Sequence, residues 1–347
     1  MSKRKLEGAE SSRAGRARLA ELAGLHAVPD TALAAIVSRL LPGETLSSRR
    51  VSEAAVNVFN TRTRHGKLGV EVQLPLDNGS RRPWAVLPPQ ALLAHMSENS
   101  EKMAEVLRSM RQPSYRHPWG ILVYFDEATP GNPLDAAAKR RKFWNILWTF
   151  EEMPRWARHH SRSWFLFGIL RSQDMTDIPG GLATVFAVVV ETFVQGPVSF
   201  TDAGVPLCLG GHDRRVYATI RRTPADGGAL QQLYGRMGAN GLKPCVLCRN
   251  CTRRGSPALE HDPTARSIAC TDFSQFTLNG DADLARIQDI LAALARRGIS
   301  RNELKAHETA FGFHFYQHSW LQSPSLRRYI QPASMVRYDA MHVFFAD

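Results

Sequence analysis

Residues 223–251 read TPADGGALQQLYGRMGANGLKPCVLCRNC. Asp226 follows a β-rich segment, and a short helical stretch, a glycine-rich turn and Cys245-x-x-Cys248 come after it. A carboxylate at the end of a strand can hold a catalytic metal ion, and a close cysteine pair can hold zinc. The stretch therefore predicts a metal-dependent site with a zinc-stiffened insertion beside it.

Apolar, β-favouring runs surround this stretch and outline a sheet. The predicted strands cover residues 67–76, 120–125, 143–150, 164–170, 205–209 and 215–220. Helices are predicted at residues 88–110, at 181–194, where an apolar helix would be buried, and at 284–297, where Gly298 ends an amphipathic pattern. The expected fold class is α/β, with a mixed sheet flanked by helices.

The chain divides into three predicted regions. Residues 1–20 are polar and begin with a basic run, which predicts a disordered basic tail. Residues 21–115 are expected to be a helical accessory region. Residues 116–347 are expected to form the main domain with the cysteine-containing insertion.

Charge and the absence of sorting signals narrow the class of protein. The 347 residues contain 44 Lys and Arg against 32 Asp and Glu, a net charge of +12. Such an excess favours a polyanionic partner, for which nucleic acid is the candidate. There is no secretory signal or apolar run long enough to cross a bilayer, so we expect an intracellular protein with reduced cysteines. Lys3, Arg4 and Lys5 are a short candidate for nuclear import.

Asp126 is the predicted partner of Asp226, because it ends the strand at residues 120–125. In a mixed sheet an early and a late strand can be neighbours, so carboxylates at their ends can meet. Two adjacent carboxylates repel each other unless a cation lies between them, and Mg²⁺ suits oxygen ligands. Glu127 and Asp135 are alternatives to Asp126. The competing interpretation is that both aspartates are turn or helix-capping residues.

Cys245 and Cys248 have the spacing with which two thiolates bind one tetrahedral zinc ion. A complete site needs two more ligands, for which the candidates are Cys251, His261, Cys270 and His342. A redox-active pair is the rival interpretation, but it expects a thioredoxin-like βαβ unit that the pattern lacks. Unliganded cysteines remain a further alternative, and Cys208 is expected in the core.

Asp339 and His342 form a D-x-x-H pattern near the end of the sequence. If this segment is helical, the two side chains share a face and can point to one site. The competing interpretation is a surface aspartate and a partly buried histidine.

Taken together, these motifs resemble the RNase H-like catalytic domain of eukaryotic DDE transposases of the CACTA and Plavaka-like group. The resemblance covers residues 119–347 and rests on VYFDEATPGN with KRRKFWNILWTF, on ADGGALQQLYGRMGANGLKPCVLC, and on YDAMH. It implies metal-dependent DNA strand cleavage and transfer in a nuclear protein, with DNA as the partner and Mg²⁺ or Mn²⁺ as the catalytic ion. An oligomer is compatible with it.

The resemblance also implies roles for individual residues. Asp126 and Asp226 take the positions of the catalytic carboxylates, and Cys245, Cys248, Asp339 and His342 take those of the family's zinc-associated motifs. A third carboxylate, usually Glu, is required beyond the insertion. Glu303 and Glu308 precede D-x-x-H and fit poorly, so we expect a truncated copy that is inactive if this ligand is missing.

Two other functions fit the same sequence. A non-catalytic, zinc-stabilised nucleic-acid-binding protein needs the basic surface and the cysteines but neither aspartate. The other is an unrelated cytosolic α/β protein with a chance C-x-x-C, for which DNA binding would be absent or insensitive to salt.

Overall fold

A mixed seven-stranded sheet forms the centre of the molecule, in the order β13-β10-β5-β6-β7-β4-β3. The structure is a computed structural model that describes residues 57, 59–129, 142–158, 163–196, 198–245 and 247–338. The strands of this sheet are β3 (Val70–Pro75), β4 (Arg81–Val86), β5 (Trp119–Ala128), β6 (Phe143–Phe150), β7 (Phe165–Arg171), β10 (Ala218–Ala225) and β13 (Val336–Tyr338). The expectation of an α/β fold with a mixed sheet is confirmed.

The mode of strand pairing changes once across the sheet, at β5. β5, β6 and β7 form an antiparallel meander, and β4 and β3 extend it by antiparallel pairing. On the other side, β10 lies parallel to β5, and β13 lies parallel to β10. The predicted adjacency of the first strand of the main domain and a late strand is therefore confirmed.

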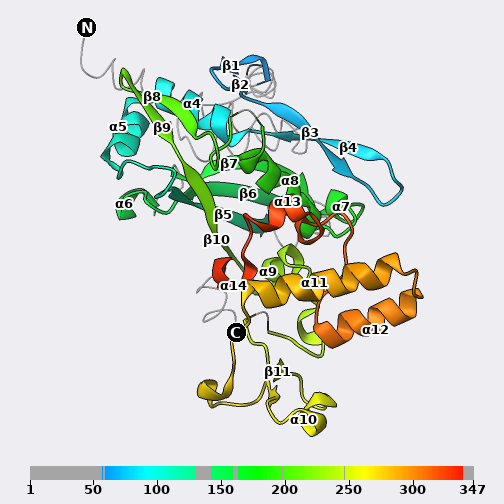
Figure 1. The fold of residues 1–347 in the computed structure, drawn as a ribbon. Coiled ribbons are helices and arrows are strands. Elements are labelled where there is room, and N and C mark those ends of the chain that lie inside the picture. The colour runs from blue at the N-terminus through cyan, green and yellow to red at the C-terminus, as the bar shows by residue number, and fades with distance from the viewer. Residues whose placement is uncertain are drawn as a thin grey trace.

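Helix α8 (Leu182–Val194) covers one face of this sheet (Figure 1). Ten of its 13 residues are buried, as expected for a helix that is apolar on all sides. The ring of Phe186 meets Phe125 of β5 edge-on at 5.6 Å. Trp148 of β6 contacts Phe165, Phe193 and Phe150, with ring centroids 4.7, 5.3 and 5.5 Å apart. This aromatic cluster fixes α8 against the meander.

Strand β10 changes partner along its length, and this change opens the end of the sheet. Its Cα atoms pair with β5 as far as Arg222 opposite Leu122, and then with β13 from Thr223 opposite Val336. The last residues of β5 are left paired with β6 alone. Helix α9 (Gly227–Leu233) starts directly after β10, with Asp226 as its N-cap.

The segment before β5 belongs to the same core. The β3–β4 hairpin extends the sheet inside the range expected to be helical, and buried residues from Leu68 to Met110 join the central cluster. The helix predicted at residues 88–110 is two helices, α4 (Pro89–Asn99) and α5 (Glu101–Ser109). Ser100 is extended between them, and its side chain accepts a hydrogen bond from Met103 N, which makes it the N-cap of α5.

Smaller elements complete the fold. The strand predicted at residues 215–220 is divided between β9 (His212–Val216), which pairs with β8 (Val205–Leu209), and β10. The short pair β1 (Arg62–Thr63) and β2 (Gly66–Lys67) precedes the sheet. The remaining short helices are α6 (Arg155–Arg158), α7 (Ser172–Met175), α13 (Pro324–Arg327) and α14 (Pro332–Met335), with 3-10 turns at Gly238–Asn240, Phe273–Gln275 and Trp320–Gln322.

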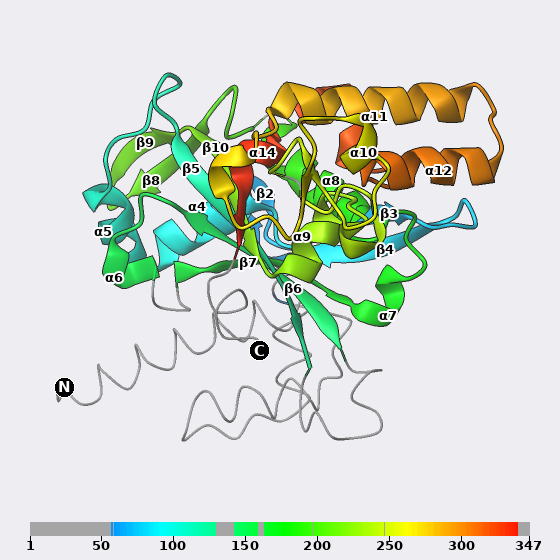
Figure 2. The same cartoon turned by 90° about the horizontal axis from the view of Figure 1, so that it is seen from below.

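Residues 241–280, called here the cysteine insertion, extend from the end of the sheet where β10 stops (Figure 1). They contain the parallel pair β11 (Cys251–Thr252) and β12 (Arg266–Ser267), and helix α10 (Ala258–His261). The chain then forms the antiparallel helices α11 (Asp281–Arg296) and α12 (Arg301–Phe311), which lie side by side (Figures 1 and 2). The predicted amphipathic helix at 284–297 is confirmed as α11.

Candidate functional site

A pocket of about 440 Å³ lies where β5 and β10 end. Its wall combines the ends of these strands with α7, the start of α8 and the first turns of α9. The lining residues are Glu127, Trp144, Ser172, Met175, Thr176, Gly181, Asp226, Gly228, Ala229 and Gln232. Glu127 and Asp226 are the two carboxylates among them, so residues 99 positions apart in the sequence meet in one cavity.

Glu127 is held by two donors. Lys142 Nζ lies 2.6 Å from Oε2, and Ser172 Oγ donates to Oε1 at 2.7 Å. Burial acts to raise the pKa of Glu127, but the hydrogen bonds from Lys142 and Ser172 and the charge of Lys142 outweigh it and lower the pKa. The carboxylate is therefore ionised at neutral pH, with a lysine ammonium as its counter-ion.

Asp226 has a structural task as well as a place in the pocket. Its Oδ1 accepts a hydrogen bond from Ala229 N at 2.5 Å, which caps α9. The capping role that competed with metal binding in the sequence is thus present. It uses one oxygen of the carboxylate, and the residue is only partly buried, so the two roles are compatible.

Asp126 is not among the lining residues of the pocket. On strand β5, Asp126 lies opposite Asn145 of β6, and the next residue, Glu127, lies opposite Trp144 without a break in the strand register. Because successive side chains on a strand point to opposite faces, Asp126 lies on the face away from Phe125 and Glu127. Of the two acidic residues at this strand end, Glu127 is the one that lines the pocket together with Asp226.

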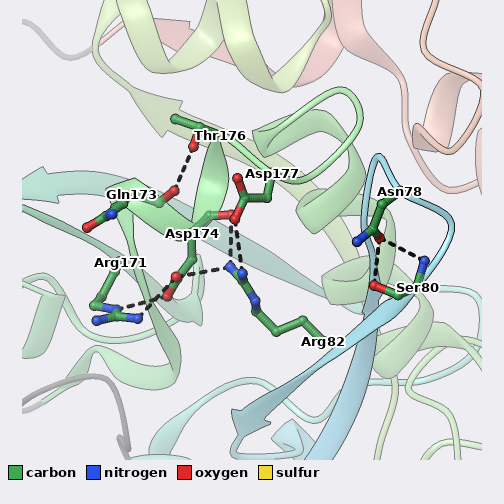
Figure 3. Close-up of polar contacts among 8 residues, drawn as sticks. All are labelled: Asn78, Ser80, Arg82, Arg171, Gln173, Asp174, Thr176 and Asp177. Atoms are coloured by element: carbon green, nitrogen blue, oxygen red, sulfur yellow. Dashed lines mark hydrogen bonds and ion pairs between the residues drawn. The ribbon is translucent and has the colours of Figure 1, made fainter.

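A cluster of ion pairs fixes the α7 wall of the pocket (Figure 3). Asp174 Oδ1 lies 3.0 Å from Arg82 of β4, and Asp174 Oδ2 lies 2.9 Å from Nε of Arg171. Arg82 also reaches Asp177 at 3.0 Å. Ser172, which donates to Glu127, is the first residue of the helix that these ion pairs fasten to β4. The sequence gives no signal for Arg82, whose strand lies far away along the chain.

Three of the five cysteines lie near one another in the cysteine insertion. Burial, a hydrogen bond with Cys245 and the charges of Cys245 and Cys251 raise the pKa of Cys248 to about 12, against the opposing charge of Arg236. Burial and Cys245 raise the pKa of Cys251 as well. Among the described residues, no three His, Cys, Asp or Glu side chains are arranged to hold a metal ion.

Hydrogen bonds to one amide hold the insertion together. Asn250 Nδ2 donates to Thr264 O at 2.8 Å and to Gln275 O at 2.9 Å, and Oδ1 accepts from Thr277 N at 2.9 Å. Asn250 is 8% exposed, and it ties Thr264 and the segment of Gln275 and Thr277 to the stretch of chain between Cys248 and Cys251. Sequence analysis missed it, because its partners become neighbours only in the fold.

The other predicted ligands lie elsewhere. Cys270 faces the carbonyl of Asp272 at 3.6 Å, and His261 is exposed at the end of α10. Glu303 and Glu308 both lie on α12, where Glu303 accepts a hydrogen bond from the N-cap residue Ser300 and Glu308 accepts one from Phe315 N beyond the helix. Asp135, Asp339, His342 and the tail at residues 1–20 lie outside the described residues.

Comparison with protein-family models gives no match. Comparison with curated proteins likewise finds no similar sequence. In the part of the chain that the structure describes, none of the helices has the length and apolarity needed to span a membrane.

Proposed function

We propose that this chain is a DNA-binding protein with an RNase H-like domain of the DDE transposase type, in the CACTA and Plavaka-like group. Its chemistry would be metal-dependent cleavage and transfer of DNA strands. The observation that carries the proposal is the meeting of Glu127 and Asp226 in one pocket at the ends of two adjacent parallel strands.

The topology supports this proposal. An antiparallel meander (β5, β6, β7) is followed by the buried helix α8 and by two strands, β10 and β13, that run parallel to the first. This order of elements is the one expected of an RNase H-like domain. The β3–β4 hairpin is an addition at one edge, and the cysteine insertion is an addition between β10 and β13.

The pocket offers the ligand chemistry of Mg²⁺ or Mn²⁺. Carboxylate oxygens are the hard ligands that these ions prefer, and two such ions can activate water and stabilise a leaving oxygen. In the metal-free protein Lys142 balances the charge of Glu127, and the Lys142 side chain is 38% exposed. A divalent cation that binds Glu127 would replace the ammonium, which can turn into solvent.

Zinc binding by Cys245 and Cys248 is the second part of the proposal, with Asp339 and His342 as further ligands by resemblance. Cys251 is an additional thiol in reach of the pair, as its effect on Cys248 indicates. The raised pKa of Cys248 describes the metal-free protein, and a zinc ion would deprotonate the thiols outright. Zinc here would stiffen the insertion.

A specific observation favours the non-catalytic alternative. Glu127 and Asp226 are the only carboxylates among the described residues that line the pocket, and Lys142 already balances one of them. If no third ligand is supplied, the same fold would bind DNA without cleaving it.

The test is nicking of supercoiled plasmid DNA with Mn²⁺ or Mg²⁺, using Asp226→Asn, Glu127→Gln and Asp126→Asn. We expect the first two to lower the rate at least about 100-fold, the scale of losing one contact to developing charge. Asp126→Asn should have a much smaller effect. Unchanged nicking in Asp226→Asn would refute the proposed site, and DNA binding without nicking in the unaltered chain would favour the alternative.

A further inference from the structure

The α11–α12 hairpin separates its charges along its length. Residues 296–305, at the turn between the helices, contain Arg296, Arg297, Arg301 and Lys305 against the single carboxylate Glu303. We call these four side chains the tip cations. Figures 1 and 2 both place this turn at the outer end of the hairpin, away from β10 and α9.

The acidic residues of the hairpin are engaged within the protein. Asp281 accepts from Ala333 N and Ser334 Oγ, each at 2.8 Å. Asp283 caps α11 through Gly280 N at 3.0 Å, and Asp289 pairs with Arg327. Glu308 accepts from Phe315 N at 2.7 Å, and Glu303 from Ser300 N at 2.9 Å. These carboxylates fasten the hairpin to the body or cap its helices.

The tip cations are held less firmly: Arg296 Nε donates to Ala292 O at 3.3 Å, and Arg301 acts on Glu308 through its charge without an ion-pair contact. All four are exposed, and none forms an ion pair within the described residues. The core-facing side of α11 is formed by Leu284, Gln288 and Leu291. With 16 residues rising about 1.5 Å each, α11 is roughly 24 Å long, and Arg296 and Arg297 lie at the end opposite Asp281.

Helix stability explains only half of this arrangement. Arg296 and Arg297 lie at the C-terminal end of α11, where a cation interacts favourably with the helix dipole by about 0.3–1 kcal/mol. Arg301 is the first residue of α12, where a cation opposes the dipole. It also adds positive charge next to the two arginines across a short turn. A polyanion bound at the tip would relieve this repulsion.

We propose that the tip of the α11–α12 hairpin binds the phosphate backbone of double-stranded DNA. The choice of DNA as the polyanion rests on the proposed function, but the contact itself needs neither the pocket carboxylates nor a metal ion. Binding here is independent of base sequence, because arginine and lysine side chains reach phosphates without reading base edges.

The experiment measures the affinity of the full chain for a random-sequence DNA duplex across salt concentrations, in EDTA. The test variant is Arg297→Gln/Arg301→Gln/Lys305→Gln. The matched control is Lys67→Gln/Arg81→Gln/Lys102→Gln, three exposed cations on β2, β4 and α5 that form no ion pair among the described residues. Both variants lose three charges, so they separate position from net charge.

We expect the tip variant to raise the dissociation constant about tenfold or more and to lower the salt slope by about 2–3, since each lost phosphate contact removes nearly one unit. The control should change both by much less. Equal effects of the two variants would overturn the proposal, as would tip-dependent binding that is tighter for duplex RNA than for DNA. Glu127→Gln/Asp226→Asn should keep the tip-dependent binding, so failure of the catalytic proposal is distinguishable.

Discussion

Residues 223–251 contribute to both the carboxylate pocket and the cysteine insertion, yet the two sites are built in different ways. The pocket depends on pairing between strands about 100 residues apart in the sequence. Glu127 and Asp226 line one cavity because β5 and β10 are adjacent in the sheet. The insertion depends on polar contacts within residues 241–280, above all those of Asn250.

This difference predicts that the two sites differ in local stability. The pocket shares the large apolar core that α8 covers, so it should persist as long as the whole domain is folded. The insertion has a small core and exposes Phe273, Leu278 and Ile268, which are 83, 74 and 54% accessible. Opening of the insertion should therefore cost less free energy than unfolding of the sheet.

The largest expected effect on the contrast between the sheet core and the insertion is that of Phe186→Ala in α8. Removing a fully buried ring against Phe125 should lower the free energy of unfolding by about 3–5 kcal/mol, because it leaves a cavity in the core. Urea denaturation measures this change. Phe273→Ala is the matched control, since the same truncation at an exposed ring should leave stability nearly unaltered. Equal destabilisation by both would contradict a core centred on α8.

Sequence periodicity was sufficient for the elements whose pattern is local. The strand at residues 143–150 is β6, and the apolar run at 181–194 is a buried helix, as predicted. The predicted helix at residues 88–110 was wrong in its continuity, because Ser100 caps a second helix inside it. The extended backbone of Ser100 and the hydrogen bond that its side chain accepts from Met103 N interrupt the helix, and the spacing of apolar residues gives no sign of either.

The face of β5 could not be read from the sequence. Residues 120–125 are apolar on both faces, so alternation does not reveal whether Asp126 or Glu127 points towards α8. The contact of Phe125 with Phe186 of α8, together with the unbroken register of β5 with β6, decides this. The same holds for Lys142, Ser172 and Arg82, whose contacts with the pocket or its α7 wall arise from tertiary packing.

Asn250→Ala should weaken the insertion without weakening the sheet. Three hydrogen bonds of a buried amide are lost, and the groups left without partners should cost about 2–3 kcal/mol of local stability. Amide hydrogen exchange should accelerate in residues 247–280 and stay unchanged in β5, β6 and β7. Asn302→Ala, at an exposed position on α12, is the control. Equal acceleration in the sheet would show that the two regions open together.

The smallest expected effect concerns the charge of Glu127. Its pKa is lowered in the fold, so its contribution to stability is present above the unfolded-state pKa near 4.5 and is lost as the pH falls through the lower folded value. In EDTA, Glu127→Gln should reduce the free energy of unfolding by about 0.5–1 kcal/mol at pH 7, since the pair with Lys142 is partly exposed. At pH 3 the difference should nearly vanish.

Glu71→Gln on β3 is the control for that measurement, because Glu71 is exposed and forms no ion pair among the described residues. It should leave stability nearly unaltered at both pH values. If Glu127→Gln also has no effect at pH 7, Lys142 does not stabilise the folded pocket, and a divalent cation would meet a carboxylate without a competing partner. If the difference persists at pH 3, the carboxylate acts through packing rather than charge, and the pocket would resemble the insertion in being held by neutral contacts.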